Sequence, residues 1–392
     1  MKKILLLTFF AASLQTLLAQ WVTKDSLKIK RQEMPAVLLD KKIYIMGGIA
    51  ANAVTLSSME RYNPSTNSWD TVAPMPATRH HHCAAVANNK IYVFGGYDNV
   101  LFKARNEVYE YNPITNTWLA KDTLPQKIGA SDAVEFNGKI YLFGGATNAN
   151  TLRTTYVYDP IQNTWSQKAS FNIAREHLAA AVIGNKIYVV SGRGSQDAET
   201  ALEVYDPATD SWQPLQSLPT ARSGIDAAVV AGRLLVFGGE GNGAVFAQCE
   251  AYDPVSNTWQ TLSPMPNARH GLTSTAIGDT IYTIGGGIKA NLGASNINEA
   301  YIVPLYNNIG ETNEKASIFY YDRSNKNLVW AKDAEEQNQA AEIGIYTITG
   351  QEVFKGLVNK NHVFPCTFLP TGFYFATHQT SNSRSSFRFL VE

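Results

Sequence analysis

Six basic residues recur at nearly constant spacing along most of the chain. Each lies 16 or 17 residues before a pair of small residues, and the six are Arg31, Arg79, Lys127, Arg175, Arg222 and Arg269. Histidines follow several of them directly: His80, His81 and His82, then His177 and His270. If the repeating units close around an axis, these side chains meet at one mouth of a channel, where arginine can bind a carboxylate through paired hydrogen bonds. The spacing therefore predicts a cationic channel mouth for an acidic ligand.

A structural role explains the same spacing equally well. A guanidinium group carries five N–H donors in a fixed geometry and can bond several backbone carbonyls at once. Basic residues at equivalent positions would then brace the repeating units and leave no charge for a ligand. The sequence leaves both interpretations open.

Acidic residues approach the predicted mouth as well. Glu240 and Asp98 follow the small-residue pairs of two repeats, and Glu176 follows Arg175. Carboxylates beside cations would suit proton transfer on an acidic sugar. The predicted ligand-binding residues are the six basic residues together with His81, His177, His270 and Glu240. No individual residue is assigned a catalytic role.

Metal ions and cofactors are not expected from the sequence. Side chains alternate along a strand, so His80 and His82 would share a face while His81 points away. No cysteine or carboxylate stands at a spacing diagnostic of a metal site. The sequence also lacks a glycine-rich phosphate loop, a serine nucleophile elbow and a zinc-binding His-Glu helix motif.

An internal repeat must position these residues. Six apolar segments end in small residues and recur every 47 to 49 residues, beginning at Ile43, Ile91, Ile140, Ile187, Leu234 and Ile281. The first five are each followed by Tyr-Asn-Pro or Tyr-Asp-Pro and, seven residues after the tyrosine, by a tryptophan: Trp69, Trp118, Trp165, Trp212 and Trp259. Apolar runs predict buried strands, and Asn-Pro or Asp-Pro predicts a turn. Each unit thus reads as a four-stranded antiparallel sheet that must stack on its neighbours around an axis.

This repeat resembles that of the kelch family of β-propellers over about residues 21–305, with Ser191 in place of a glycine in the fourth unit. The resemblance implies an all-β fold of six blades and arginines that bond carbonyls of the neighbouring blade. The sixth unit lacks its tryptophan strand, whereas Trp21 lies ten residues before Arg31, as Trp69 lies ten residues before Arg79. We therefore expect the Trp21 strand to close the ring as the last strand of the sixth blade, within a propeller of residues 20–305.

The two ends of the chain predict export. Lys2 and Lys3 precede an apolar run that ends near Ala19, a pattern typical of a secretory signal peptide over residues 1–19. An N-terminal membrane anchor is the alternative, but the run is shorter than the roughly 20 apolar residues that a membrane span needs. No later segment is apolar enough to cross a bilayer. We expect a protein secreted through the periplasm to the outer cell surface or the medium.

After a predicted linker over residues 306–315, alternating strands return in residues 316–392 and predict a small immunoglobulin-like β-sandwich. The segments 345–351, 369–374 and 386–391 are similar to the C-terminal sorting domain of type IX secretion cargo. That resemblance implies recognition by the type IX secretion machinery and removal of the domain after export. The chain departs from that family by ending on Glu392 instead of a basic residue.

Composition limits the classes of partner. Lys plus Arg and Asp plus Glu both number 33, so the net charge is zero, which argues against binding to nucleic acid or an anionic membrane. Three cysteines are too few for a disulfide framework. We expect a binding or interaction module for an acidic glycan or a protein partner. The alternative is an enzyme that resembles, in outline, the exported kelch mutarotases of sialic acid.

Overall fold

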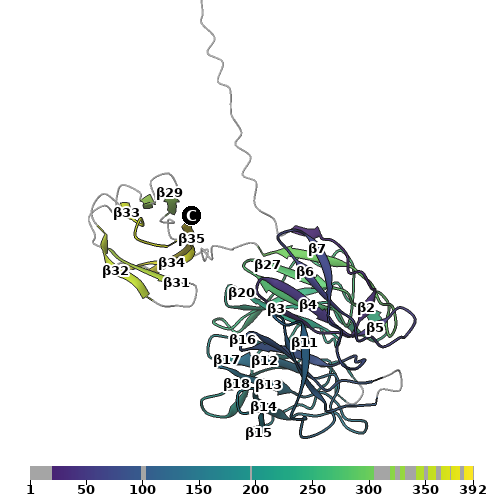
Figure 1. Cartoon of the computed structure of the whole chain (residues 1–392). Coiled ribbons are helices and arrows are strands. Elements are labelled where there is room, and N and C mark those ends of the chain that lie inside the picture. The colour runs from purple at the N-terminus through teal and green to yellow at the C-terminus, as the bar shows by residue number, and fades with distance from the viewer. Residues whose placement is uncertain are drawn as a thin grey trace, which may run out of the picture. The chain divides into compact units, whose positions relative to one another are not determined.

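The computed structural model describes residues 20–98, 103–194 and 197–303, and in the C-terminal part residues 318–322, 327–331, 341–347, 352–358, 363–370, 372–379 and 384–391. The predicted signal peptide and linker lie outside the described residues. The chain divides into two compact units, Met1–Pro304 and Leu305–Glu392 (Figure 1). Every regular element that the described residues form is a β-strand, and none of them forms a helix long and apolar enough to span a membrane.

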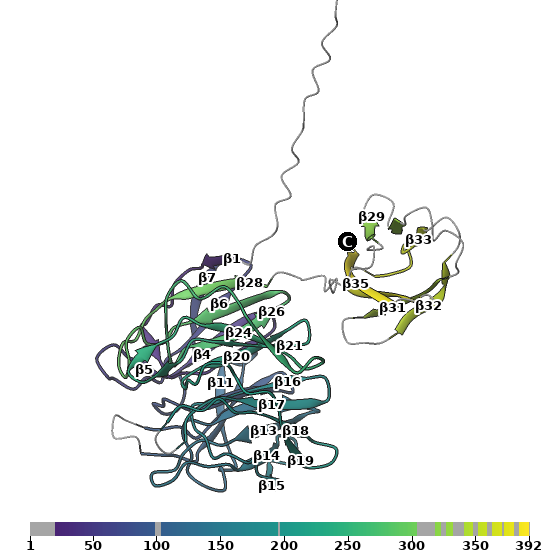
Figure 2. The same cartoon turned by 180° about the vertical axis from the view of Figure 1, so that it is seen from behind.

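The first unit is a six-bladed propeller, as the repeat predicts (Figure 2). Blades one to three are β3 (Ala36–Leu39), β4 (Lys42–Met46), β6 (Met59–Asn63) and β7 (Ser68–Val72); β8 (Cys83–Ala87), β9 (Lys90–Phe94), β10 (Val108–Asn112) and β11 (Thr117–Lys121); and β12 (Asp132–Phe136), β13 (Lys139–Phe143), β14 (Thr155–Asp159) and β15 (Thr164–Lys168). Within each blade, neighbouring strands pair antiparallel.

Blades four to six continue this pattern. They are β16 (Ala179–Ile183), β17 (Lys186–Val190), β18 (Leu202–Asp206) and β19 (Ser211–Pro214); β20 (Asp226–Val230), β21 (Arg233–Phe237), β24 (Cys249–Asp253) and β25 (Thr258–Thr261); and β26 (Thr273–Ile277), β27 (Thr280–Ile284), β28 (Asn298–Ile302) and β1 (Gln20–Thr23). Two short pairs lie on connecting loops, β2 (Arg31–Gln32) with β5 (Ile49–Ala50) and β22 (Glu240–Gly241) with β23 (Ala244–Val245).

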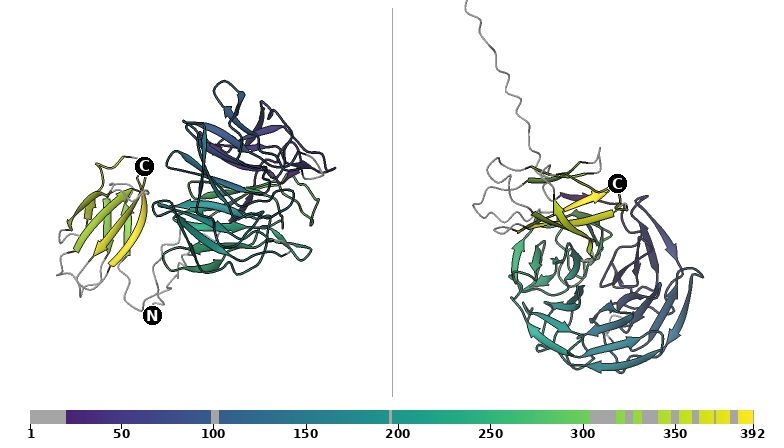
Figure 3. Two further views of the ribbon diagram at one scale, coloured as in Figure 1. Left: turned by 90° about the horizontal axis from the view of Figure 1, so that it is seen from below. Right: turned by 90° about the vertical axis from the view of Figure 1, so that its left-hand side faces the viewer.

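The first strands of the blades form the innermost ring. Each of β3, β8, β12, β16, β20 and β26 contacts the first strands of the two adjacent blades, and the last of them contacts β3 again. Figure 3 shows the blades grouped around this common centre. Side chains at the beginnings of these strands therefore converge on the axis.

The closing strand is the N-terminal one. Strand β1 pairs with β28, with Trp21 opposite Tyr301, so the sixth blade takes its fourth strand from the start of the propeller sequence. This is the pairing expected from the position of Trp21. The Trp21 ring lies 4.9 Å from the Tyr301 ring, and its Nε1 donates to the carbonyl of Ser263.

The tyrosine and tryptophan of the repeat fasten each blade to the one before it. Tyr62 donates its hydroxyl hydrogen to Asn67, whose side-chain oxygen also accepts the backbone N–H of Asp25. Trp69 donates from Nε1 to the Asp25 carbonyl at 2.8 Å. The same three bonds recur in blades two to five, with Asp210 in the place of asparagine in blade four. The repeated residue types thus hold the blades together, and the loops near the axis are left for function.

The pair of small residues that ends each second strand allows adjacent blades to approach. Gly47 has φ +59°, and a Cβ there would lie 2.5 Å from the carbonyl oxygen of Arg79 in the next blade. Ser191 takes the equivalent place in blade four with φ 58°.

The second unit contains two sheets. One has the strand order β29 (Ile318–Asp322), β30 (Asn327–Ala331), β33 (Val363–Pro365), and the other the order β32 (Glu352–Val358), β31 (Ala341–Thr347), β34 (Gly372–Gln379), β35 (Arg384–Val391). Buried residues of this unit include Ile343, Ile345, Leu369 and Tyr374. The immunoglobulin-like and sorting-domain assignments remain predictions.

Candidate functional site

Five of the six predicted mouth cations are arginines buried inside the blades. The side chains of Arg31, Arg175, Arg222 and Arg269 have no exposed surface. Each forms an ion pair with a glutamate on the third strand of its own blade, at 2.5 Å for Arg31–Glu60, 2.8 Å for Arg175–Glu203 and 2.6 Å for Arg269–Glu299, and likewise for Arg222–Glu250. Arg79 pairs with Glu107 at 3.1 Å.

The arginines also bond backbone carbonyls. Nη1 of Arg31 donates to Gly47 and Ser58, and Nη1 of Arg175 donates to Ser191 and Ala201. These carbonyls belong to the arginine's own blade, and not to the neighbouring blade as the family resemblance implied. Burial lowers the pKa of Arg175 to about 10, and the charge of Glu203 opposes that shift. The buried, paired arginines therefore support the bracing interpretation and offer no free cationic ring.

Lys127 requires a correction. The equivalent of Arg79 in the third blade is Ile128, whose backbone N–H donates to the Arg105 carbonyl as that of Arg79 donates to Leu56. Lys127 is one residue out of register and exposed to solvent. Its spacing of 17 residues, where the arginines have 16, is the sequence signal of this shift. Tyr156 stands where blades one, four, five and six carry their glutamate, so the third blade lacks both members of the buried pair. The second blade also has a tyrosine there, Tyr109, and its Arg79 pairs with Glu107 instead.

A closed ring of backbone hydrogen bonds surrounds the axis, two residues beyond each arginine position. Its members are Glu33, His81, Ala130, His177, Gly224 and Gly271, one from each blade. The N–H of each donates to the carbonyl of the member in the preceding blade, at 2.7–3.1 Å, and Glu33 donates to Gly271 to complete the circle. All six have positive φ, between 50° and 61°. We call this set the axial ring.

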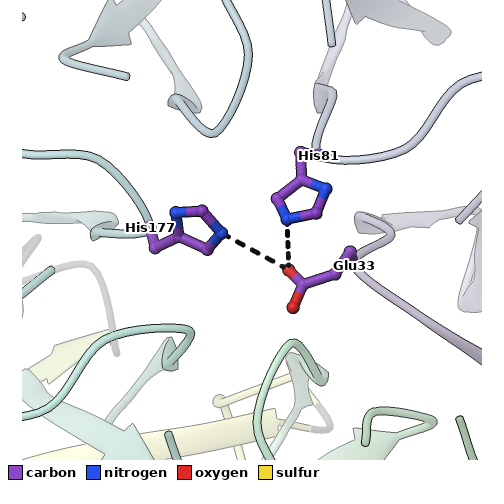
Figure 4. A group of neighbouring side chains, drawn as sticks. All are labelled: Glu33, His81 and His177. Atoms are coloured by element: carbon purple, nitrogen blue, oxygen red, sulfur yellow. Dashed lines mark ion pairs between the residues drawn. The ribbon is translucent and has the colours of Figure 1, made fainter. Parts of the chain in front are cut away.

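Three side chains of the axial ring meet at the axis. Nε2 of His81 lies 3.4 Å from Oε2 of Glu33, and Nε2 of His177 lies 4.0 Å from the same oxygen (Figure 4). One ligand-type atom from each residue lies within 4.8 Å of the others. The remaining members are alanine and glycine, so the large polar side chains have room to converge.

Further polar residues surround this cluster at the channel mouth. Nδ1 of His270 lies 3.4 Å from Oε1 of Glu33 and 3.5 Å from Oε2 of Glu240. Nδ1 of His177 lies 3.4 Å from Oε1 of Glu176, which also accepts from Nε of Arg193 at 2.7 Å. Arg193 and Glu240 approach each other at 3.8 Å. Blades one, two, four, five and six all contribute to the mouth.

The charges in the mouth depend on one another. Burial would raise the pKa of the Glu33 carboxyl, but the nearby His81, His270 and His177 lower it below its usual value. Burial lowers the pKa of His81, against the opposing charge of Glu33. Burial would likewise lower the pKa of His270, but a hydrogen bond to Glu33 and the charges of Glu33 and Glu240 raise it. The neighbouring imidazoles thus favour the ionised form of the Glu33 carboxyl at the axis.

A second acidic layer lies further along the channel. Asp132 accepts the backbone N–H of Ala180 at 2.7 Å, and Asp226 accepts that of Ser274, so each carboxylate links its blade to the next. Burial, with the charge of Asp226, raises the pKa of Asp132 to about 7, and burial raises that of Asp226 to about 6. The axial ring and both aspartates line one cavity of about 180 Å³.

A second cavity opens on the loops of blades four, five and six. Its volume is about 250 Å³, and polar residues dominate its lining: Arg193, Asp197, Ser223, Glu240, Asn242 and Asn291. The backbone N–H of Asn291 lies 3.3 Å from Oε2 of Glu240. Glu240 and Arg193 therefore belong both to this cavity and to the channel mouth.

The structure thus divides the predicted site residues into two groups. It brings His81, His177, His270 and Glu240 together, while the arginines are inside the blades and Lys127 is on the surface. His81 reaches the axis because residue 81 has a left-handed conformation before β8 begins, so the alternation expected of a strand does not apply to it. Sequence reasoning missed Glu33 and Arg193; Glu33 is two residues after Arg31, the place of His81 after Arg79 and of His177 after Arg175.

Comparison with known proteins identifies the repeat. The profile of the KLHDC2/KLHL20/DRC7 Kelch-repeats domain matches residues 33–174 and 120–286, which together cover more than half of the chain. Similar curated proteins include Kelch-like protein terF of Aspergillus terreus (35% identity over 83 residues, 20% of this chain and 18% of that protein) and human Kelch-like protein 28 (36% over 85 residues, 20% and 15%). Alpha-scruin of Limulus polyphemus is 32% identical over 91 residues, 23% of this chain and 10% of that protein.

The matched segments span less than a fifth of the length of these relatives. The profile match covers all six blades in part and agrees with the strand order of the structure. Domains of this kind mediate protein interactions, so the propeller is an interaction module. The chain belongs to the kelch-repeat family.

Proposed function

We propose that this kelch propeller is an exported binding module that takes a hydroxyl-rich ligand, a glycan, at the channel mouth. The observation that carries the proposal is the convergence of Glu176, Arg193, Glu240 and His270 beside an open polar cavity. Hydrogen bonds within the ring backbone and between blades already hold the propeller together. The side chains at the mouth are therefore available for binding.

The balance of charge at the mouth favours hydroxyl groups over a strongly anionic ligand. Glu176 and Glu240 both approach Arg193, whose side chain is 39% exposed, and Glu33 adds a third carboxylate at the axis. Carboxylates accept hydrogen bonds and guanidinium donates them, and a sugar hydroxyl does both. The acidic ligand expected from the spacing of the arginines loses its main support, because those arginines are paired with glutamates.

The size of the loop cavity suits a small part of a larger ligand. Its volume of about 250 Å³ is below the roughly 300–1,000 Å³ of sites for complete small molecules. Asn242, Asn291 and Ser223 add amide and hydroxyl groups to the charged pair. One or two sugar residues at the end of a glycan chain fit this description. A polar loop of a protein partner is the other occupant, and it is an outcome of the test below.

Export rests on the two ends of the chain. The pattern of residues 1–19 and the resemblance of residues 316–392 to a sorting domain support secretion and an outer-surface location. The experiment is intact-mass analysis of the protein recovered from the surface or medium of its native host. Loss of residues 1–19 and of most of residues 316–392 supports the proposal, and recovery of the complete C-terminus contradicts the sorting assignment.

A glycan array tests the binding function. The full chain is screened together with Glu240→Gln and Arg193→Ala. Lys127→Ala serves as control because Lys127 is exposed and is not among the residues that line either cavity. We expect wild type and Lys127→Ala to share the same glycan hits, and both mouth variants to lose them. If wild type gives no hit and instead captures a defined protein partner, the glycan ligand is rejected, while the proposal of a binding module stands.

A second candidate function is sugar mutarotation or epimerisation. The observation that favours it is the approach of His270 and Glu240 to 3.5 Å at the edge of the cavity, because a carboxylate and an imidazole in contact can transfer protons as base and acid. The test is NMR measurement of anomer interconversion for sialic acid and neutral sugars. A rate in the presence of protein equal to the buffer rate excludes this activity.

A further inference from the structure

The group Glu33, His81 and His177 has the composition and spacing of a metal site. Each residue comes from a different blade, and their ligand-type atoms lie within 4.8 Å of one another (Figure 4). Two ligand atoms bound to one metal ion at 2.0–2.2 Å, in tetrahedral geometry, lie about 3.4 Å apart. The observed separations from Glu33 Oε2 are 3.4 Å to His81 and 4.0 Å to His177. The His81 separation matches coordination, and the more widely spaced ligand atoms would have to move closer together around one ion.

The surroundings of His81 and His177 direct Nε2 of each ring towards Glu33. Nδ1 of His177 faces the Glu176 carboxylate, which leaves Nε2 to face Glu33. Nδ1 of His81 faces Nδ1 of His80, and its Nε2 faces Glu33 in the same way. Histidines that bind metals almost always donate their other N–H to a carboxylate, a backbone carbonyl or water, and Glu176 is such a carboxylate beside His177. Both rings therefore present Nε2 to the axis.

Residues further from the axis hold the cluster in place. Arg193 donates to the Glu176 carboxylate at 2.7 Å and so fixes the group that orients His177. His270 is anchored through Nε2, 2.9 Å from the carbonyl oxygen of Lys289, and directs Nδ1 towards Glu33 at 3.4 Å. Three imidazoles from three blades thus point a nitrogen at one carboxylate.

The axial ring reserves the space for Glu33. A Cβ on Gly271 would lie 2.2 Å from Oε1 of Glu33, so only glycine is compatible with the carboxylate in this position. The other small members, Ala130 and Gly224, bring no large side chain to the axis. The cavity of about 180 Å³ adjoins all three candidate ligands. A bound ion would keep at least one coordination position for water or for a ligand group.

We propose that Glu33, His81 and His177 bind one divalent transition-metal ion on the propeller axis. Two histidines and one carboxylate form the ligand set of open zinc sites and of non-haem iron sites, and borderline-soft ions that accept imidazole fit it better than calcium or magnesium. The inference does not rest on the glycan proposed above. It differs from the expectation from sequence, in which no metal binds and His80 and His82 are the histidines that share a face.

Zinc binding by the full chain tests the proposal. Protein stripped with a chelator is titrated with ZnCl₂ in competition with a zinc indicator, and bound metal is counted by mass spectrometry after dialysis. We expect one zinc ion per chain for wild type. Glu33→Gln and His177→Ala should each weaken binding more than about 100-fold, since each removes a ligand, and Glu176→Gln by about 10- to 100-fold, as is usual for a residue that orients a ligand.

The control is His378→Ala, which removes a histidine from β34 in the second unit and should leave zinc binding unchanged. Cobalt supplies an independent readout, because the visible absorption of bound Co²⁺ should appear in wild type and be lost in His177→Ala. Circular dichroism shows whether each variant is folded, and Glu176→Gln keeps all three ligands if a ligand variant fails to fold. The proposal is overturned if wild type binds no zinc at one equivalent, or if Glu33→Gln and Glu176→Gln bind it as tightly as wild type.

Discussion

The backbone N–H of Glu33 donates a 2.8 Å hydrogen bond to the carbonyl oxygen of Gly271, a residue of the last blade. This bond joins the first and sixth blades and completes the axial ring of six such bonds. The same pair meets through its side chains, because the absent Cβ of Gly271 makes room for the Glu33 carboxylate. Closure of the propeller and formation of the polar cluster therefore depend on the same two residues.

Substitution of Gly271 should affect both closure and the cluster. Gly271→Ala places a Cβ 2.2 Å from Oε1 of Glu33, at φ +50°, and we expect a loss above the roughly 1–3 kcal/mol that a strained φ alone costs. Gly278→Ala is the matched control, since Gly278 has φ +63° with no atom near the position of a Cβ. Denaturant unfolding of both variants measures the difference. Equal losses would show that the contact with Glu33 has no energetic weight.

The buried arginines should behave as scaffold. Arg175→Ile removes the cation paired with the buried Glu203 carboxylate, which then keeps its bonds from Asn172, and loss of one member of a buried ion pair typically costs about 3–5 kcal/mol. The double variant Arg175→Ile/Glu203→Tyr installs the pair of residues that the third blade carries naturally, Ile128 and Tyr156, and should recover part of that loss. Lys127→Ala, on the surface, should change stability by less than about 0.5 kcal/mol. Thermal unfolding measures the stability of these variants. An unchanged stability of Arg175→Ile would contradict the bracing role.

The closing strand should contribute strongly to stability. Trp21→Ala removes ring contacts with Tyr301 and Phe237 and a hydrogen bond to Ser263, and a loss of about 3 kcal/mol is expected for a packed tryptophan. Leu119→Ala provides the comparison, because Leu119 lies on the outer strand β11 and is 59% exposed. A melting temperature unchanged by Trp21→Ala would show that β1 is dispensable for closure.

The aspartate layer should make stability fall as pH rises. The pKa of Asp132 is raised to about 7 and that of Asp226 to about 6, from an ordinary value of 3.8. The folded state then binds protons more tightly than the unfolded state, so the pair stabilises below pH 4 and this contribution is lost as pH rises through 6 to 7.

Melting temperatures at pH 5 and pH 8 measure this effect. The difference between them should shrink in Asp132→Asn relative to wild type. Glu135→Gln, an exposed residue of the same strand β12, should leave the difference unchanged. An identical pH dependence in wild type and Asp132→Asn would show that the two carboxyls titrate normally.

Much of the fold follows from the sequence because the repeat encodes it locally. The tyrosine, the asparagine and the tryptophan bond to one another or to the preceding blade at fixed offsets, and they recur in five units. Together with the six apolar segments they predict six blades. Trp21 fits the same register, and its partner Ser263 occupies the place that Asp25 has for Trp69. The regular spacing of the repeat therefore predicts the propeller architecture.

The site was less accessible to the same reasoning. In the sequence the arginines look like possible ligands, because charge type alone does not show burial and their partners lie far along the chain. Glu203, the partner of Arg175, is 28 residues away. Charge aligns Lys127 with the arginines, whereas the backbone register selects Ile128. Glu33 was missed because its role depends on left-handed residues of five other blades, which no local pattern reveals.

The most direct test of the binding site uses the seven histidines of the chain as probes of where a ligand binds. The full chain, labelled with ¹⁵N-histidine, is titrated with the best glycan from the array, and the imidazole signals are followed by two-dimensional NMR. His177 and His270 line or adjoin the mouth, so their signals should shift in a saturable manner, while that of His378 in the second unit should not. Binding that leaves both mouth histidines unshifted, or that shifts only His378, would contradict the assignment of the ligand site to the channel mouth.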